Sequence, residues 1–159
     1  MALKTDHAGR PSAEILTFLI ADIRGYTSFT QEHGDEAATR LAMKFAEIAR
    51  EGVEARDGTV VSYRGDEALC VFGSARQAIR AAVDLQLTFA DEVTLDPSLP
   101  LRVGIGLDAG EAVPVDDGYR GGALNLAARL CSQAGPGEVL ASQGVLHLTR
   151  AMEDLRFTE

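Results

Sequence analysis

Residues 15–27 have the sequence ILTFLIADIRGYT, and this stretch decides the expected fold. Its first seven residues, Ile15–Ala21, form a short and nearly continuous apolar run, which is typical of a strand buried on both faces of a sheet. The run ends at Asp22, and Gly25 then breaks the pattern before a short helix expected over Tyr26–Gln31. The sequence therefore predicts a central strand that ends in a carboxylate.

A strand pair and two helices are expected after this opening. Apolar residues recur every three or four positions over 38–49 and again over 79–90, which predicts two amphipathic helices, the second capped by Ser74. Between them, Thr59–Tyr63 and Glu67–Phe72 are apolar runs separated by only three residues, so they are expected to pair as a hairpin.

Strands and helices also alternate in the second half of the chain. Leu101–Leu107 has the alternating pattern of a half-buried strand, and a turn at Asp108–Gly110 is expected to lead it into a further strand. A polar, glycine-rich loop over 116–122 precedes a helix over Leu124–Gln133. A short strand and a last helix follow over 139–149. Helices that alternate with hairpins require a mixed sheet, so we expect an α+β, ferredoxin-like sandwich with a mixed or antiparallel sheet and helices packed on one face.

Length and composition limit the classes of protein to consider. The 159 residues are 46% hydrophobic and 25% charged, which fits one domain over 15–159 after a polar lead over 1–14. A net charge of −9 argues against nucleic acid as a partner. No apolar run suits a membrane span or a signal peptide, so we expect no membrane contact from this segment and a cytoplasmic location. Cys70 and Cys131 lack paired spacing and are expected to be buried thiols.

Two aspartates are candidates for a metal site. Asp22 closes the buried strand, and Asp66 lies at the tip of the first hairpin. If the hairpin lies beside the central strand, both carboxylates meet at one edge of the sheet, where they suit Mg²⁺ and the phosphate oxygens it shares. Paired metals activate an attacking oxygen and neutralise a leaving phosphate. The competing interpretation is structural, with each aspartate capping its own turn.

Two further groups suit an anionic ligand. Gly25, Tyr26 and Thr27 form a helix entry whose free backbone amides can face an anion, three residues after a candidate metal ligand. Asn125 and Arg129 are four residues apart on one expected helix and therefore share a face. An arginine fork suits charge that develops on a phosphate, although a solvated polar face explains the same pair.

Five segments together carry a resemblance to a known family. They are Phe18–Thr27 (FLIADIRGYT), Arg64–Phe72 (RGDEALCVF), Arg102–Gly106 (RVGIG), Gly121–Leu130 (GGALNLAARL) and Ala134–Ser142 (AGPGEVLAS). In this order and spacing they resemble the class III adenylate/guanylate cyclase catalytic domain, over about 15–145.

The resemblance implies a role for each candidate residue. Asp22 and Asp66, with the backbone carbonyl of Ile23, would hold two Mg²⁺ or Mn²⁺ ions, and residues 25–27 would cradle the β- and γ-phosphates of a nucleoside triphosphate. Asn125 would orient the ribose and Arg129 would stabilise charge on the α-phosphate. In this family the metal-binding aspartates and the Asn–Arg pair of one site come from different subunits, so the resemblance implies a homodimer with two composite sites.

This sequence departs from the family at the positions that select the base. The first selector, usually lysine for ATP or glutamate for GTP, is Ser62 here, and the second, commonly aspartate, is Gly118. Arg64 and Asp117 are the nearby charged residues that could replace them. The chain also ends at Glu159, before the family's last strands and their phosphate-binding lysine, which suggests a piece of a longer protein with further domains or a naturally short domain.

Three functions are consistent with these features. An active nucleotidyl cyclase in intracellular signalling, with ATP favoured over GTP only because adenylyl cyclases are the commoner bacterial type, is favoured by the retained aspartates and the Asn–Arg pair. A catalytically weak, nucleotide-binding regulatory or dimerisation domain is favoured by Ser62 and Gly118. A diguanylate cyclase is suggested by the hairpin Gly65-Asp66-Glu67, but the helix with Asn125 and Arg129 counts against it.

Overall fold

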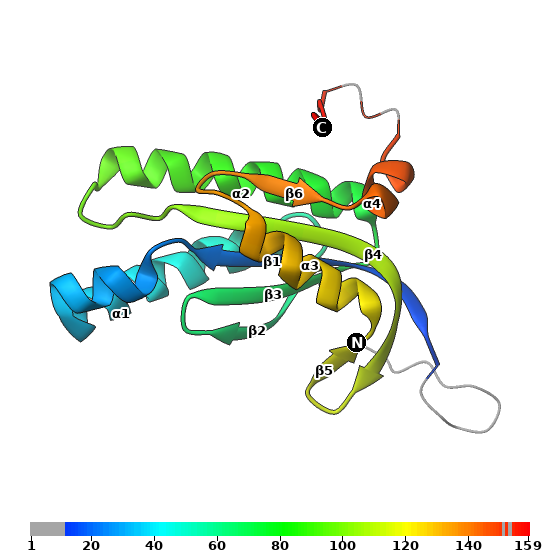
Figure 1. Cartoon of the computed structure of the whole chain (residues 1–159), viewed down its shortest axis with the longest axis horizontal. Helices are drawn as coiled ribbons and strands as arrows, with labels where there is room; N and C mark the ends of the chain where they lie inside the picture. The colour runs from blue at the N-terminus through cyan, green and yellow to red at the C-terminus, as the bar shows by residue number, and fades with distance from the viewer. Residues whose placement is uncertain (1–11, 151, 153) are drawn as a thin grey trace.

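A computed structural model describes residues 12–150, 152 and 154–159 of the chain. Most of the polar lead expected over 1–14 lies outside these residues. Within them the elements, in chain order, are β1 (Glu14–Ile23), α1 (Tyr26–Glu54), β2 (Thr59–Arg64), β3 (Glu67–Phe72), α2 (Ala75–Leu95), β4 (Val103–Val115), β5 (Gly118–Arg120), α3 (Gly122–Gln133), β6 (Val139–Ala141) and α4 (Gln143–Leu148), as Figure 1 shows.

The strands form one mixed sheet with β1 at its centre. The strand order is β2-β3-β1-β4-β5, and β6 pairs with β4. All pairings are antiparallel except that of β4 with β6, which is parallel. The α+β class, the mixed sheet and the central position of the apolar strand are thereby confirmed.

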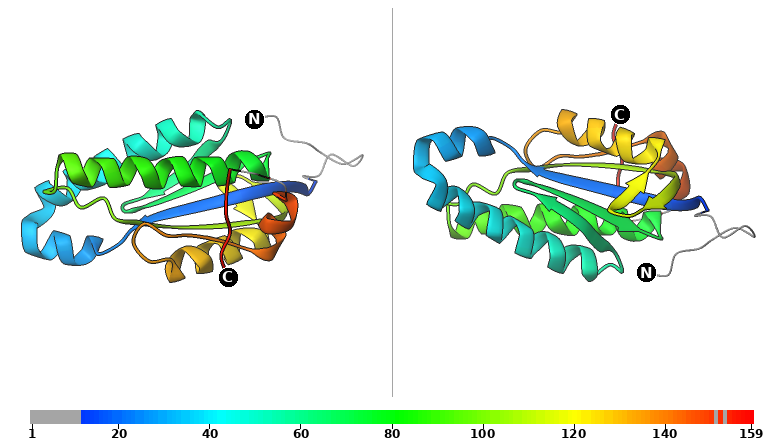
Figure 2. Two further views of the ribbon diagram at one scale, coloured as in Figure 1. Left: turned by 90° about the horizontal axis from the view of Figure 1, so that it is seen from above. Right: turned by 90° about the horizontal axis from the view of Figure 1, so that it is seen from below.

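The helices cover both faces of this sheet, so the expectation of helices on one face is wrong. α1 and α2 lie on one face and α3 lies on the other, as both views in Figure 2 show. Alternate residues of β1 serve the two layers: Leu19 and Ala21 pack in the core under α1 and α2, whereas Phe18 and Ile20 pack in the core under α3. A strand that is apolar on both faces requires cover on both faces.

β4 also differs from the expected pattern. It is one strand of 13 residues, without the turn expected at Asp108–Gly110. The ladder with β1, which runs from Ala112 opposite Glu14 to Val103 opposite Ile23, carries β4 through that segment. The second hairpin lies further along, where β5 occupies part of the loop expected over 116–122. Pairing with a neighbouring strand here outweighs the local turn preference of Asp and Gly.

The first two helices differ from expectation only in where they begin and end. The two helices expected over 26–31 and 38–49 are joined in α1, which is interrupted at Gly34, where φ is +86°. The helix expected to end near Ala90 continues to Leu95.

Both cysteines are free and buried, as expected. Among the described helices, none combines the length and the apolarity that a bilayer span requires.

α3 lies directly against β4 because β4 carries glycines on that face. A side-chain carbon at Gly106 would collide with the Ala127 carbonyl and the Cys131 amide of α3. At Gly104 it would lie 2.8 Å from the Ala134 carbonyl oxygen, just after the helix. The alternating glycines of the RVGIG segment therefore let the backbone of α3 approach the sheet and fix where its side chains lie.

Candidate active site

The end of β1 brings two carboxylates together. Asp22 is the next-to-last residue of β1, and Asp66 lies in the two-residue turn between β2 and β3. The Ile23 amide donates a hydrogen bond to the Asp66 carbonyl oxygen at 2.9 Å, which fixes the hairpin tip against the end of β1. Gly65 has φ +61°, a conformation that glycine adopts without the strain a side chain would add. The strand register thus places Asp66 next to Asp22.

The two carboxylates line a pocket of ≈ 340 Å³. One wall is the start of α1, where Gly25 has φ +75° and the helix follows directly. The first amides of a helix have no intrahelical acceptor, so this wall offers hydrogen-bond donors and the positive end of the helix dipole. The lining residues are Asp22, Ile23, Arg24, Gly25, Tyr26, Thr27, Ser28, Asp66 and Ser132.

The Asp22 carboxyl is in an unfavourable environment for a negative charge. Burial raises the pKa of Asp22 to about 7, and the adjacent Asp66 carboxyl contributes to the increase, while the Arg24 guanidinium opposes it. Oδ2 of Asp22 accepts a hydrogen bond from Arg24 at 2.8 Å. Oδ1 is buried and has no hydrogen-bond partner. A cation in the pocket would satisfy this oxygen and allow both carboxylates to be ionised.

The donor set fits a divalent cation that also binds a phosphate. Within the described part of the chain, no three or more His, Cys, Asp and Glu side chains form a metal-binding group. Two carboxylates therefore leave most ligand positions to backbone oxygen, water and a substrate. This is how Mg²⁺ is commonly held beside substrate phosphates, in contrast to an all-protein cage.

Asp22→Asn is expected to stabilise the metal-free protein more as the pH rises from about 4 to about 7. The raised pKa of Asp22 means that its contribution to folding stability is complete below the pKa of an unfolded aspartate and is lost as the pH passes through about 7. Asparagine does not ionise and avoids that loss. Thermal unfolding of both proteins in chelator, across this pH range, measures the difference.

The exposed Asp91 of α2 offers a matched control, and Asp91→Asn is expected to show no such trend. Added Mn²⁺ is expected to raise the melting temperature of the unmodified protein and not that of Asp22→Asn. A difference between Asp22→Asn and the unmodified protein that stays constant with pH would contradict the assigned environment of Asp22.

Asn125 and Arg129 lie outside this pocket. Both are exposed on α3, one turn apart, and neither belongs to the pocket lining. Ser132, three residues after Arg129, is the α3 residue that reaches the pocket. In a single protomer the pair therefore presents its side chains to solvent, outside the pocket.

The two positions expected to select the base, Ser62 and Gly118, lie on the same side of the sheet as α3. Ser62 pairs with Leu69, whose side chain packs in the core under α3, and a bulge precedes Ser62 at Val61. A side-chain carbon at Gly118 would lie 3.9 Å from Val61 Cγ1, so the two positions are near neighbours. Gly118 has φ +153°, which disfavours any other residue there.

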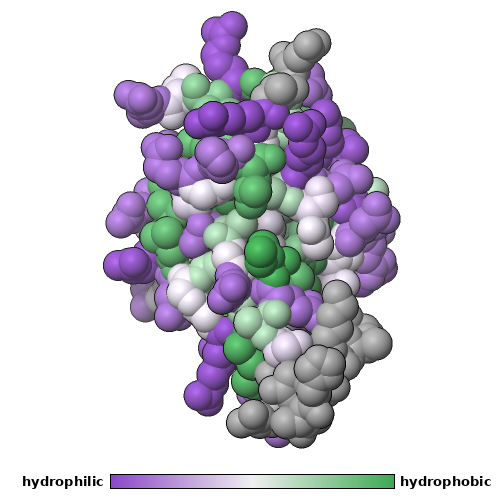
Figure 3. Space-filling view, turned by 90° about the vertical axis from the view of Figure 1, so that its right-hand side faces the viewer, coloured by the Kyte–Doolittle hydropathy of each residue, from purple (hydrophilic) through white to green (hydrophobic). Residues whose placement is uncertain are grey.

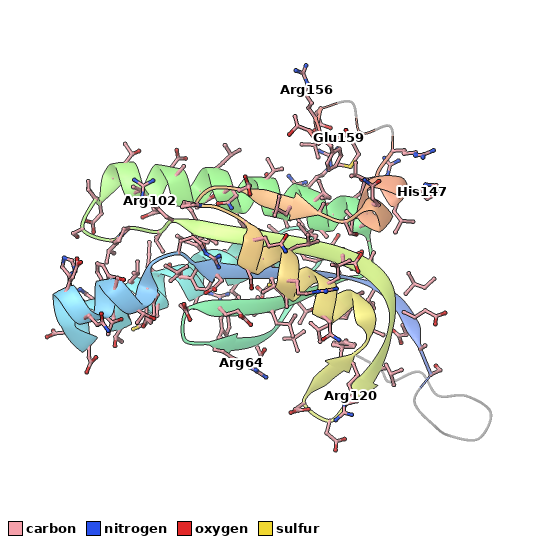
Figure 4. The ribbon with its side chains drawn as sticks, viewed as in Figure 1. Arg64, Arg102, Arg120, His147, Arg156 and Glu159 are labelled. Carbon is pink, nitrogen blue, oxygen red and sulfur yellow. The ribbon has the colours of Figure 1, made fainter. Side chains whose placement is uncertain are left out.

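Of the two charged residues that could replace the selectors, neither is placed to do so in a single protomer. Arg64 points away from the sheet beside the hairpin (Figure 4), and Asp117 is exposed in the β4–β5 turn.

Arg24, Ser28 and Ser132 line the pocket although no role was expected for them from the sequence. Arg24 follows Asp22 by two residues, but its contacts with the end of α3 depend on tertiary structure. Ser132 shares the helical face of Asn125 and Arg129, and that spacing is the one signal that could have indicated it.

Comparison with known proteins gives consistent results. The family described as "Adenylate and Guanylate cyclase catalytic domain" matches residues 10–159. The chain is 30% identical, over 91% of its length, to a protein of Rhizobium meliloti (strain 1021) named "Putative adenylate cyclase 3", of which it covers 25%. It is 33% identical, over 77% of its length, to an uncharacterised protein of Mycobacterium tuberculosis, of which it covers 31%. The chain thus spans about a quarter to a third of these relatives.

Solved structures show the same fold. An adenylate/guanylate cyclase/hydrolase from Silicibacter pomeroyi aligns with a TM-score of 0.80 at 26% identity, over 93% of this chain and 87% of that protein. The guanylyl cyclase Cya2 aligns with a TM-score of 0.78 at 25% identity, over 86% of this chain and 79% of that one.

Proposed function

This chain belongs to the adenylate and guanylate cyclase catalytic domain family, and on that premise we propose that it converts a nucleoside triphosphate, ATP or GTP, into a 3′,5′-cyclic nucleotide and pyrophosphate. The observation that carries the proposal is the pocket in which Asp22 and Asp66 lie beside the first turn of α1. Carboxylates for a cation and free amides for phosphate stand next to each other there, as a metal–triphosphate complex requires.

Each group of pocket residues has its own role in the proposed reaction. Asp22 and Asp66, with backbone oxygen from Ile23, would hold two Mg²⁺ or Mn²⁺ ions. When bound, such ions neutralise phosphate charge and lower the pKa of a coordinated hydroxyl. The amides of residues 25–27 donate hydrogen bonds to the β- and γ-phosphates at the positive end of α1.

The reaction makes one bond and breaks one bond at the α-phosphorus. The 3′-hydroxyl of the ribose gives its proton to water and its oxygen attacks this phosphorus, the bond to the bridging oxygen of the β-phosphate breaks, and pyrophosphate carries away the electron pair. Asn125 orients the ribose so that the 3′-oxygen lies in line. Arg129 donates hydrogen bonds to the α-phosphate as charge develops, in the manner of other arginines that act on phosphoryl groups.

The proposed enzyme is a homodimer with two composite sites. Asn125 and Arg129 are exposed and do not line the pocket of their own protomer. A second copy would bring its α3 to this pocket and complete it, and by symmetry it would receive the same residues in return.

Exposed hydrophobic side chains support a second copy as the partner. At the end of the sheet where β1 begins and β4 extends, Ile15 is 71% exposed and Val113 is 37% exposed on these paired strands. Figure 3, which faces this end of the molecule, shows hydrophobic side chains gathered between hydrophilic ones. Apolar groups that stay exposed together often mark a protein interface.

A second candidate function is nucleotide binding with little turnover, in a regulatory role. Ser62 and Gly118 favour it, because neither side chain can form a charge-assisted bond with a base. The deciding experiment incubates the protein with each of four nucleoside triphosphates and Mn²⁺ and identifies the products by mass spectrometry. A cyclic nucleotide with pyrophosphate supports the cyclase, and binding without product supports the alternative.

Base discrimination between ATP and GTP is expected to be modest. A lysine or glutamate selector adds a charge-assisted hydrogen bond, and leaving a buried polar group unpaired separates ligands by about 1–3 kcal/mol. Ser62 offers only a hydroxyl group, and Gly118 has no side chain. The ratio of kcat/KM for the two nucleotides measures the effect. A ratio above about 10³ exceeds what one unpaired polar group of about 1–3 kcal/mol provides and would show that other residues identify the base.

A further inference from the structure

The side chain of Arg24 connects the candidate metal site to the end of α3. One guanidinium nitrogen, Nη2, donates to Asp22 Oδ2 at 2.8 Å. The other, Nη1, donates to the carbonyl oxygens of Cys131 at 3.2 Å and Ala134 at 3.3 Å. The arginine therefore spans two parts of the chain that are more than a hundred residues apart in sequence.

The surroundings of Arg24 make this connection specific. Its guanidinium lies over Gly104, where a side-chain carbon would come within 3.3 Å of Arg24 Cζ. The side chain of Arg24 is only 21% exposed. The carbonyls that it binds belong to the last turn of α3 and to the residue that follows the helix. That last turn contains no basic side chain of its own. A cation at this position also suits the negative end of the helix dipole.

On the other side, Arg24 determines which oxygen of Asp22 is available. It occupies Oδ2, while Oδ1 is buried and has no hydrogen-bond partner. The hydrogen bond to Oδ2 comes from a guanidinium whose other nitrogen is held by carbonyls at the end of α3, so it restrains rotation of the carboxylate and leaves Oδ1 available to a cation. Partners of this kind, which orient a metal-binding group without touching the metal, commonly change metal affinity 10- to 100-fold when removed.

We propose that Arg24 is a positioning residue that orients Asp22 for a divalent cation and couples occupancy of that cation site to the position of α3. The coupling has a further meaning that rests on the proposed function. In the composite homodimer, Asp22 serves one site while Asn125 and Arg129 of the same protomer serve the other. Arg24 then connects the two active sites of the dimer through a single side chain.

Arg24→Lys tests the proposal because it keeps the charge and removes the fork. A single ammonium group cannot reach Asp22 and the carbonyls at the end of α3 together. The matched control is Arg40→Lys, since Arg40 is an exposed arginine of α1 whose ion pair with Glu36 is 3.8 Å long. Two measurements use the intact protein without nucleotide: Mn²⁺ affinity by electron paramagnetic resonance, and hydrogen exchange of the amides at 131–137 with and without Mn²⁺.

We expect Arg24→Lys to weaken Mn²⁺ binding by about 10-fold or more, with Arg40→Lys unchanged. In the unmodified protein, Mn²⁺ is expected to alter exchange at the end of α3, and Arg24→Lys is expected to abolish that response. Mn²⁺ affinity within threefold of the unmodified protein, or a response that persists in the variant or is absent from the unmodified protein, overturns the proposal.

A second variant keeps the test available if Arg24→Lys does not fold. Arg24→Gln can donate to Asp22 or to α3 but not to both, so the same losses are expected. If both variants fail to fold while Arg40→Lys folds, Arg24 is structural and the positioning role is wrong. Neither measurement requires turnover, so absence of cyclase activity would contradict the proposed function and leave this inference standing on its own evidence.

Discussion

Asp66→Ala is expected to abolish cyclisation while leaving the fold intact. Asp66 lies in a turn and belongs to neither hydrophobic core, so its side chain contributes little to packing. Its loss leaves Asp22 as the single carboxylate of the pocket, and the proposed pair of ions would lose a shared ligand. We expect turnover to fall by at least ~10³-fold, equivalent to about 4 kcal/mol in the barrier. Asp22→Ala is expected to have the same effect.

The measurement is the rate of cyclic nucleotide formation at saturating Mn²⁺, where a mere loss of metal affinity would be compensated. Circular dichroism and the melting temperature establish that each variant is folded. Asp91→Ala, on the exposed face of α2, is the control for removal of an acidic side chain. A variant at either pocket aspartate that keeps more than about a tenth of the normal rate, far above the expected loss, would refute the two-metal assignment.

Mixing two inactive variants is expected to restore activity. As homodimers, Asp66→Ala and Arg129→Ala each damage both composite sites. In the proposed mechanism Arg129 stabilises charge that develops in the transition state, so its loss is expected to reduce kcat by roughly 10²–10³-fold. In a heterodimer both changes fall in one site and the other site is intact, so random pairing restores about a quarter of the normal activity.

This experiment requires subunit exchange, which labelled subunits can demonstrate independently. The control is a mixture of Asp66→Ala with Asp22→Ala, because both changes affect the same half of a site and no intact site forms. If exchange is shown and the Asp66→Ala and Arg129→Ala mixture remains inactive, the two residues do not act across an interface.

Much of the fold follows from short-range pattern. The apolar run that ends at Asp22 specifies a strand covered on both faces, and the three-residue gap before Glu67 specifies a hairpin. The turn expected at Asp108–Gly110 does not form, because β1 pairs with β4 along its whole length and these residues continue the strand. The placement of α3 on the opposite face could not be predicted, because helical periodicity shows which side of a helix is buried and not which sheet face it covers.

The candidate site could also be predicted from the sequence only in part. Adjacent placement of Asp22 and Asp66 follows from the strand register, which a hairpin beside a central strand makes predictable. The shared face of Asn125 and Arg129 follows from helical spacing. The contacts of Arg24 could not be predicted, because they depend on how closely α3 approaches β4, and that distance is decided by glycines whose neighbours only the tertiary structure reveals.

The contact of α3 with the glycines of β4 has a consequence for how this domain can change during evolution. Gly106 meets backbone atoms of the helix, and backbone atoms cannot be exchanged for smaller ones. A substitution there has no compensating partner elsewhere in the chain, whereas exposed positions of α3 other than Asn125 and Arg129 can change without displacing the helix. The position of α3 on the sheet is therefore expected to stay fixed in this lineage while those exposed positions vary.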